Sequence, residues 1–87
     1  MASFPAPTHL RPTLTRREIE VLHRWVRSES KTAAATKLGI GLGTVNTHLS
    51  RIRNKYAQAG RPAPDKATLL VRALQDQILT LAELDGV

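Results

Sequence analysis

The stretch from Thr36 to Tyr56, TKLGIGLGTVNTHLSRIRNKY, constrains the fold of this chain more than any other stretch. If a helix begins after Gly41, apolar side chains recur within it at steps of four, three and four residues. This spacing places them on one side of a helix with 3.6 residues per turn. The spacing therefore predicts a helix over residues 42–56 with a buried apolar stripe, which consists of Val45, Leu49, Ile52 and Tyr56.

The opposite face of this helix carries short polar side chains. At 100° per residue, Thr47, Ser50 and Asn54 point away from the apolar stripe, and Asn46 and Arg51 flank them. Hydroxyl, amide and guanidinium groups can form hydrogen bonds with the edges of DNA bases. The pattern predicts that this face reads DNA.

Length and composition limit what else the chain can be. Eighty-seven residues, 41% of them hydrophobic and 3% aromatic, allow one small domain with a core of aliphatic side chains. The chain has no Cys, which excludes disulfides and thiolate metal sites and fits a reduced, cytoplasmic setting. No apolar run approaches the roughly 20 residues that span a bilayer, so no membrane contact is expected.

Charge is distributed unevenly along the chain, whose formal net charge is +6. Residues 1–61 hold eleven Lys or Arg against three Asp or Glu, whereas residues 62–87 hold two against four. No acidic residue lies between Ser30 and Pro64. Because a surface free of acids suits a polyanion, the basic part of the chain favours a DNA partner.

The start of the domain is predicted by a capping box. Thr15 and Glu18 have the spacing at which each side chain accepts the backbone N–H of the other, so a helix is expected over residues 16–27. Residues 1–13 hold three Pro and lack apolar periodicity, which is typical of a flexible leader or linker remnant. The remaining residues 14–87 are expected to form one domain.

A second helix is predicted over residues 31–38, with Ser30 as its N-cap and Gly39 as its left-handed stop. A short connection containing glycine joins it to the helix over residues 42–56. This is the spacing of a DNA-reading helix-turn-helix. The N–H groups at the start of the second helix could hold a DNA phosphate together with two neighbouring side chains, Lys31 and Thr32.

A last helix is expected beyond a loop that contains Gly60, Pro62 and Pro64. Apolar residues there recur at steps of four and three, which predicts one long amphipathic helix over residues 66–84. Because this helix is longer than a small core needs, its apolar stripe either wraps its own domain or meets a second subunit. We favour dimerisation, through Val71, Leu74, Ile78 and Leu81.

The segments LTRREIEVL at residues 14–22, TKLGI at 36–40 and TVNTHLSRIRNKY at 44–56 together resemble the LuxR/NarL-type helix-turn-helix. This is the DNA-binding output domain of many bacterial response regulators. The resemblance covers residues 14–61, and its long C-terminal extension is similar to an actinobacterial variety. It implies an all-α fold of four helices, the third in the major groove and the fourth used for dimerisation.

The resemblance also implies roles for single residues. The base-reading positions of the family fall on Asn46, Thr47 and Ser50, the face that periodicity exposes. The backbone-contacting positions fall on Ser30, Thr32, Thr44, Val45 through its main chain, and Lys55. The basic surroundings add Arg51 as a supplementary base contact, and Lys31, Arg53 and Arg61 as phosphate anchors.

Two departures from the family pattern affect how DNA is read. Gly41 and Gly43 stand where family members usually have a hydroxyl cap and a polar side chain, which shortens the reach of the first helical turn. None of Asn46, Thr47 and Ser50 is Arg or Lys, so strong bidentate reading of guanine is absent from these positions.

The expected function is that of a sequence-specific transcription regulator, the output domain of a two-component response regulator. Double-stranded DNA and a second copy of the chain are its expected partners, with RNA polymerase as a further candidate. Two alternatives share parts of the pattern, namely the promoter-reading region of a sigma factor and a module that binds a partner protein. Three scattered His and no Cys offer no catalytic pair or metal site, so neither enzymatic activity nor a cofactor is expected.

Overall fold

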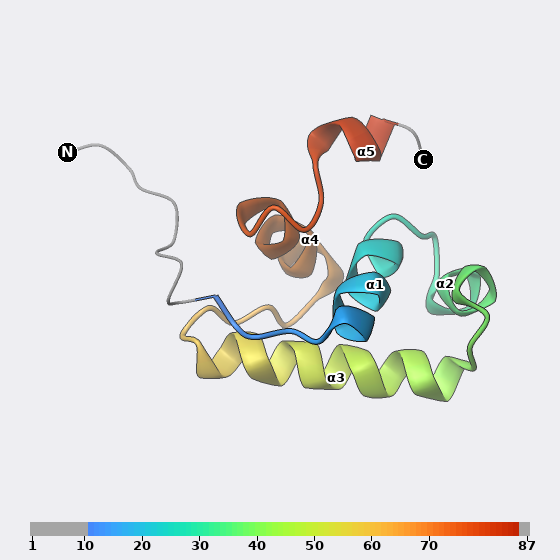
Figure 1. Ribbon diagram of the computed structural model, residues 1–87, viewed down its shortest axis with the longest axis horizontal. Helices are drawn as coiled ribbons and strands as arrows, with labels where there is room; N and C mark the ends of the chain where they lie inside the picture. Colours follow the sequence, from blue (N-terminus) through green and yellow to red (C-terminus); the bar gives the residue numbers. More distant parts are fainter. Residues whose placement is uncertain (1–10, 86–87) are drawn as a thin grey trace.

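The computed structural model describes residues 11–85, and within this range the regular secondary structure is entirely helical (Figure 1). The predicted all-α class is therefore confirmed, although the described part of the chain forms five helices. None of them is long and apolar enough to span a membrane. The helices are α1 (Arg16–Trp25), α2 (Lys31–Leu38), α3 (Leu42–Gln58), α4 (Lys66–Gln75) and α5 (Leu81–Asp85).

Helix α1 begins at the predicted capping box. Thr15 Oγ1 accepts the N–H of Glu18 at 3.1 Å, and Glu18 Oε1 accepts the N–H of Thr15 at 2.9 Å. Two backbone N–H groups that the helix itself leaves unpaired are satisfied in this way. The helix ends at Trp25 with Val26 as its C-cap, slightly before the predicted end.

The connection between α2 and α3 follows the residues that predicted it. Ser30 Oγ accepts the N–H of Ala33 at 3.0 Å, which caps α2. Gly39 lies at a φ of +69°, a left-handed conformation that residues with a side chain rarely adopt. Helix α3 then begins after Gly41, which has no side chain and leaves the helix start without a side-chain cap.

The core lies where α1, α2 and α3 meet, with α4 against α1 (Figure 1). Each residue of the predicted apolar stripe of α3 is 0% exposed, and the stripe packs in one cluster with Val21 and Leu22 of α1 and Leu69 of α4. Because this stripe is buried along the whole helix, the opposite face of α3 is turned to solvent.

The prediction of one long helix over residues 66–84 is wrong. Helix α4 ends at Gln75, Gln77 takes a φ of +61°, and α5 begins at Leu81. The break brings Leu79 into the core, where it is 1% exposed. In a continuous helix Leu79 would point away from the apolar stripe, so burying it favours the bent path.

The break also lets Asp76 bind Tyr56 in the last turn of α3 and Arg61 just after that helix. Its Oδ2 accepts hydrogen bonds from Tyr56 Oη at 2.8 Å and from Arg61 Nη1 at 3.0 Å, and its Oδ1 accepts from Arg61 Nη2 at 2.8 Å. Burial raises the pKa of the Tyr56 hydroxyl, and its hydrogen bond to Asp76 raises the pKa further, so Tyr56 stays protonated as a donor.

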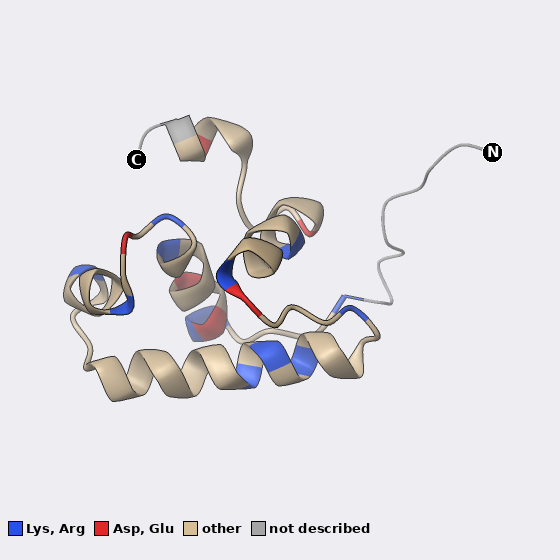
Figure 2. Ribbon diagram, turned by 180° about the vertical axis from the view of Figure 1, so that it is seen from behind, with Lys and Arg blue, Asp and Glu red and all other residues tan. Residues whose placement is uncertain are grey.

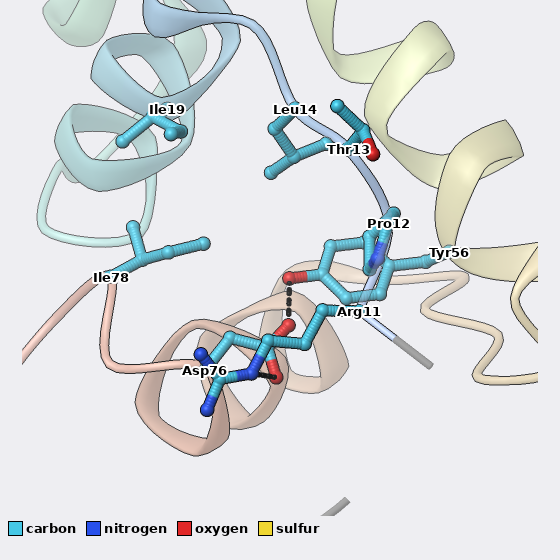
Figure 3. Close-up of a pocket in the computed structure, with 8 residues that line it drawn as sticks. All are labelled: Arg11, Pro12, Thr13, Leu14, Ile19, Tyr56, Asp76 and Ile78. Atoms are coloured by element: carbon cyan, nitrogen blue, oxygen red, sulfur yellow. Dashed lines mark hydrogen bonds and ion pairs between the residues drawn. The ribbon is translucent and has the colours of Figure 1, made fainter. Parts of the chain in front are cut away.

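Both ends of the described chain are attached to this body. Arg11 Nε lies 3.8 Å from Asp76 Oδ1 (Figure 3), and Lys55 Nζ donates to the carbonyl of Thr13 at 3.0 Å. Residues 11–13 of the predicted leader therefore contact the domain, and the rest of the leader lies outside the described residues. At the other end, Glu83 Oε2 of α5 lies 2.6 Å from His23 Nε2 of α1.

Candidate nucleic-acid interface

The predicted base-reading residues all lie on the solvent-facing side of α3. Asn46, Thr47, Ser50 and Arg51 are exposed. The hydroxyl of Thr47 donates to the carbonyl of Gly43 at 3.0 Å, so this side chain presents a methyl group and acceptor lone pairs to a partner. The face therefore combines an amide, two short hydroxyl side chains and a guanidinium.

The two helices of this region carry several Lys and Arg residues. Lys31 and Lys37 lie at the two ends of α2, and Arg51 and Arg53 lie in the second half of α3 (Figure 2). The first half of α3, over residues 42–50, has no charged side chain. The positive charge of α3 is thus confined to its second half, beside the polar side chains of its first half.

Comparison with known protein families assigns the chain to one of them. The sequence model of the family described as bacterial regulatory proteins, luxR family, matches residues 12–62, which is more than half of the chain. The chain belongs to the luxR family. It is accordingly a DNA-binding helix-turn-helix regulator of transcription, from a family of DNA-binding proteins and not of enzymes. Searches of curated proteins and of solved structures found no match.

Helices α2 and α3 form the helix-turn-helix of this luxR-family domain. The predicted phosphate contact of the Val45 main chain does not agree with the structure, because the Val45 N–H donates to the carbonyl of Gly41 at 3.1 Å. The N–H groups that precede Val45 in the first turn lack an acceptor within the helix, as at the start of any α-helix. These groups, and not the N–H of Val45, face outward from the start of α3.

Arg61, predicted to bind a phosphate, is held inside the domain. Its side chain pairs with Asp76, and its Nη2 also donates to Gln75 Oε1 at 3.0 Å. The residue is 7% exposed, so its guanidinium cannot reach DNA without abandoning a buried carboxylate. This prediction is therefore corrected, and Arg61 is a structural residue.

Lys55 is also held by the domain. Its Nζ lies 2.6 Å from Oε1 of Glu18, a residue that is 3% exposed. Burial alone would raise the pKa of the Glu18 carboxyl, but the hydrogen bonds from Lys55 and Thr15 outweigh burial, and the pKa lies below its usual range. The charge of Lys55 is thus compensated within the protein, and we omit Lys55 from the proposed phosphate contacts.

The other predicted phosphate contacts remain accessible. Ser30 Oγ accepts a hydrogen bond from Ala33 but keeps its own hydrogen to donate. Thr32 and Thr44 are exposed, and Lys31 and Arg53 are half-buried. Arg53 Nε is buried without a hydrogen-bond partner.

Within residues 11–85, no group of three or more acidic, His or Cys side chains could hold a metal ion.

Sequence reasoning missed one residue of this surface, Leu42. Its side chain is 45% exposed at the first turn of α3, four residues before Asn46. Residues four apart lie on the same side of a helix. An apolar residue at this spacing from a polar reading face was the signal that could have revealed it.

Proposed function

We propose that this domain is the output module of a two-component response regulator and that α3 enters the DNA major groove. One observation carries the proposal. The polar side of α3 faces solvent along its length while its apolar side is fully buried, and Lys and Arg residues lie on α2 and in the second half of α3. A helix of this kind, preceded by a glycine turn and a short helix, has the docking geometry of a helix-turn-helix on a duplex.

The side chains on this face determine which bases they can read. Asn46 can form two hydrogen bonds with adenine, through N6 and N7. The outward methyl of Thr47 suits the C5-methyl of thymine, and the Ser50 hydroxyl can donate or accept. Because none of these three is Arg or Lys, guanine is read only by Arg51 at the edge of the face, and the proposed site favours A·T pairs at its centre.

The phosphate contacts would come from both helices of the motif. We assign Lys31 and Thr32 to the start of α2, where the backbone N–H groups and the helix dipole also favour an anion. Thr44 lies in the first turn of α3 and Arg53 lies about two and a half turns later. Contacts of this kind position the domain on the duplex without selecting its sequence. The last phosphate contact is the Ser30 hydroxyl.

The division of roles between base and phosphate contacts gives a first prediction. Asn46→Ala should lose about 1–3 kcal/mol of discrimination at a single base pair, because one bidentate contact disappears. Arg53→Ala should weaken binding to all sequences alike and reduce the salt slope by about 1, because one phosphate charge is no longer neutralised. Fluorescence anisotropy on fragments selected from random DNA, at several salt concentrations, measures both.

Gln58→Ala is the matched control for Asn46→Ala, since Gln58 is also an exposed amide on α3 but lies in its last turn. It should leave base preference unchanged. If Asn46→Ala and Arg53→Ala both reduce affinity equally on every sequence, the assignment of reading to Asn46 is wrong.

We also propose that a second copy of the chain packs on the outer surface of α4 and α5. Val71 is 47% exposed and Leu81 is 70% exposed, so a large apolar side chain of each helix is open to solvent. A hollow of about 530 Å³ beside Leu81 is lined by Leu74 and Leu79, among others. Ile78 was predicted to join this seam, but it lines a separate pocket with Leu14 and Ile19 (Figure 3).

The test of this seam is the double change Val71→Ser and Leu81→Ser. On DNA with two half-sites one helical turn apart, it should weaken binding by about tenfold or more. The reason is that a subunit bound at one half-site no longer increases the affinity of the second subunit for the other. On DNA with one half-site it should have no effect. Ile19→Ser is the control, since it removes an exposed apolar side chain of α1 outside the seam; equal losses from both variants would argue against dimerisation here.

A further inference from the structure

Gly43 has no structural reason to be glycine. It lies inside α3, where glycine weakens a helix relative to alanine. The glycines with a positive φ in the described chain are Gly39 and Gly60, so the backbone of Gly43 does not require it. A Cβ built on Gly43 would meet no atom of the protein within 4 Å, so packing does not require it either.

The position of Gly43 on α3 is that of the proposed reading face. Thr47 follows it by four residues and Ser50 by seven, which puts the three in one row along the helix. The carbonyl of Gly43 accepts the Thr47 hydroxyl, so the two residues are in direct contact. The space that the missing side chain leaves open is therefore in front of the helix, where the duplex is proposed to lie.

Leu42 stands beside this gap. It is 45% exposed, and the described part of the chain gives its side chain no place in the core cluster. An aliphatic side chain at the start of a reading helix has one favourable partner on a base edge in the major groove, the C5-methyl of thymine. Leu42 and Gly43 thus offer a small apolar contact next to a flat stretch of main chain.

We propose that the backbone of the first turn of α3 makes the closest approach to the major groove. In this arrangement the base edges lie against Gly43, and Leu42 packs on a thymine methyl. This inference rests on the proposed function and specifies its target as duplex DNA with a thymine under the first turn. Close approach at Gly43 has a further effect. Thr47 and Ser50 have short side chains, which reach base edges only when the helix axis lies deep in the groove.

The first test replaces Gly43 by alanine. The variant should be more resistant to heat, by up to about 8 °C in midpoint temperature, because alanine favours the helix and no atom opposes its methyl. The same methyl should weaken binding to DNA by about tenfold or more, an effect opposite in sign to that on folding. Ala57→Leu is the control, an exposed site on α3 about 21 Å further along the helix, and it should bind DNA like the wild type.

The second test removes single methyl groups from the DNA. In a fragment selected from random duplexes, each thymine is replaced in turn by deoxyuridine, which lacks only the C5-methyl. At one position the wild-type domain should bind about fourfold less tightly, the loss expected for one buried methyl group. Leu42→Ala should bind the thymine and uracil forms of that fragment equally.

The outcomes separate this inference from the function on which it rests. A domain that binds no duplex at low salt overturns both. If the wild type binds duplexes, and Gly43→Ala binds them equally well, the close approach is wrong. If no thymine distinguishes the wild type from Leu42→Ala, the apolar contact is wrong, while α3 would remain the reading helix.

Discussion

Asp76→Ala is expected to lower the free energy of unfolding by about 3–5 kcal/mol, the usual effect of removing one partner of a buried ion pair. The side chain of Asp76 is 5% exposed and that of Arg61 is 8% exposed. Without the carboxylate, the Arg61 guanidinium stays buried with Gln75 as its remaining hydrogen-bond partner, and the buried Tyr56 hydroxyl loses its acceptor. The same change removes the bond that holds the turn between α4 and α5 against α3.

Urea unfolding followed by circular dichroism measures this loss. Asp65→Ala is the matched control, since Asp65 is also an aspartate that accepts hydrogen bonds, here as the exposed N-cap of α4 at 2.8 Å from the Thr68 N–H. It should cost much less, because the exposed N–H groups at the start of α4 can bind water in place of the carboxylate. If Asp76→Ala were no more destabilising than Asp65→Ala, the buried pair would not be what fixes the bend.

Ser50→Glu is expected to weaken binding to any duplex by at least about a hundredfold. Ser50 lies in the middle of the proposed reading face and is exposed, so glutamate there should not disturb folding. On DNA, however, its carboxylate would face base-edge acceptors and the phosphates beside the groove, and like charges brought together at an interface cost several kcal/mol. Each 1.4 kcal/mol corresponds to a factor of ten.

Ala82→Glu separates this effect from the change in net charge. Ala82 is exposed on α5, which lies on the other side of the molecule from α3 (Figure 1). Both substitutions lower the formal net charge of the domain by one, but the carboxylate at residue 82 is screened from DNA by distance and salt. Anisotropy titrations at about 50 mM salt, on DNA with one half-site so that the proposed seam of α4 and α5 plays no part, should therefore show a small loss for Ala82→Glu. Similar losses from the two variants would mean that α3 is not the face that meets DNA.

The sequence predicted the first three helices well because their signals are local. Three signals defined them, namely the capping box at Thr15, the left-handed stop at Gly39 and the apolar stripe of α3. Each depends only on residues within one helix or next to its ends. Since burying that stripe fixes the rotation of α3, the exposure of Asn46, Thr47 and Ser50 followed from it. The family match over residues 12–62 covers this same region.

The C-terminal region was predicted less well because two of its signals conflict. The apolar spacing continues across residues 76–80, which contain neither Gly nor Pro, and this favoured one long helix. A second capping box was also present, since Thr80 Oγ1 accepts the Glu83 N–H at 3.3 Å and Glu83 Oε1 accepts the Thr80 N–H at 2.8 Å. That spacing, together with the off-stripe Leu79, was the available sign of the break.

The ion pairs of Lys55 and Arg61 could not be predicted from spacing. Lys55 pairs with Glu18, 37 residues earlier, and Arg61 with Asp76, 15 residues later. Such partners are brought together only by the tertiary fold, in which α1 packs on both α3 and α4. The family resemblance therefore assigned Lys55 to DNA, and the basic surroundings assigned Arg61, although each neutralises a buried carboxylate of the protein itself.

The uneven charge of α3 separates two properties along a single element. Residues 42–50 are uncharged, and the cations of the helix follow from residue 51 onward. Under the proposed function, substitutions in the uncharged half can redirect the domain to a new operator while its ionic attraction to any duplex stays constant. Related regulators could acquire different target sequences in this way, one residue at a time, while each keeps the same electrostatic affinity for DNA.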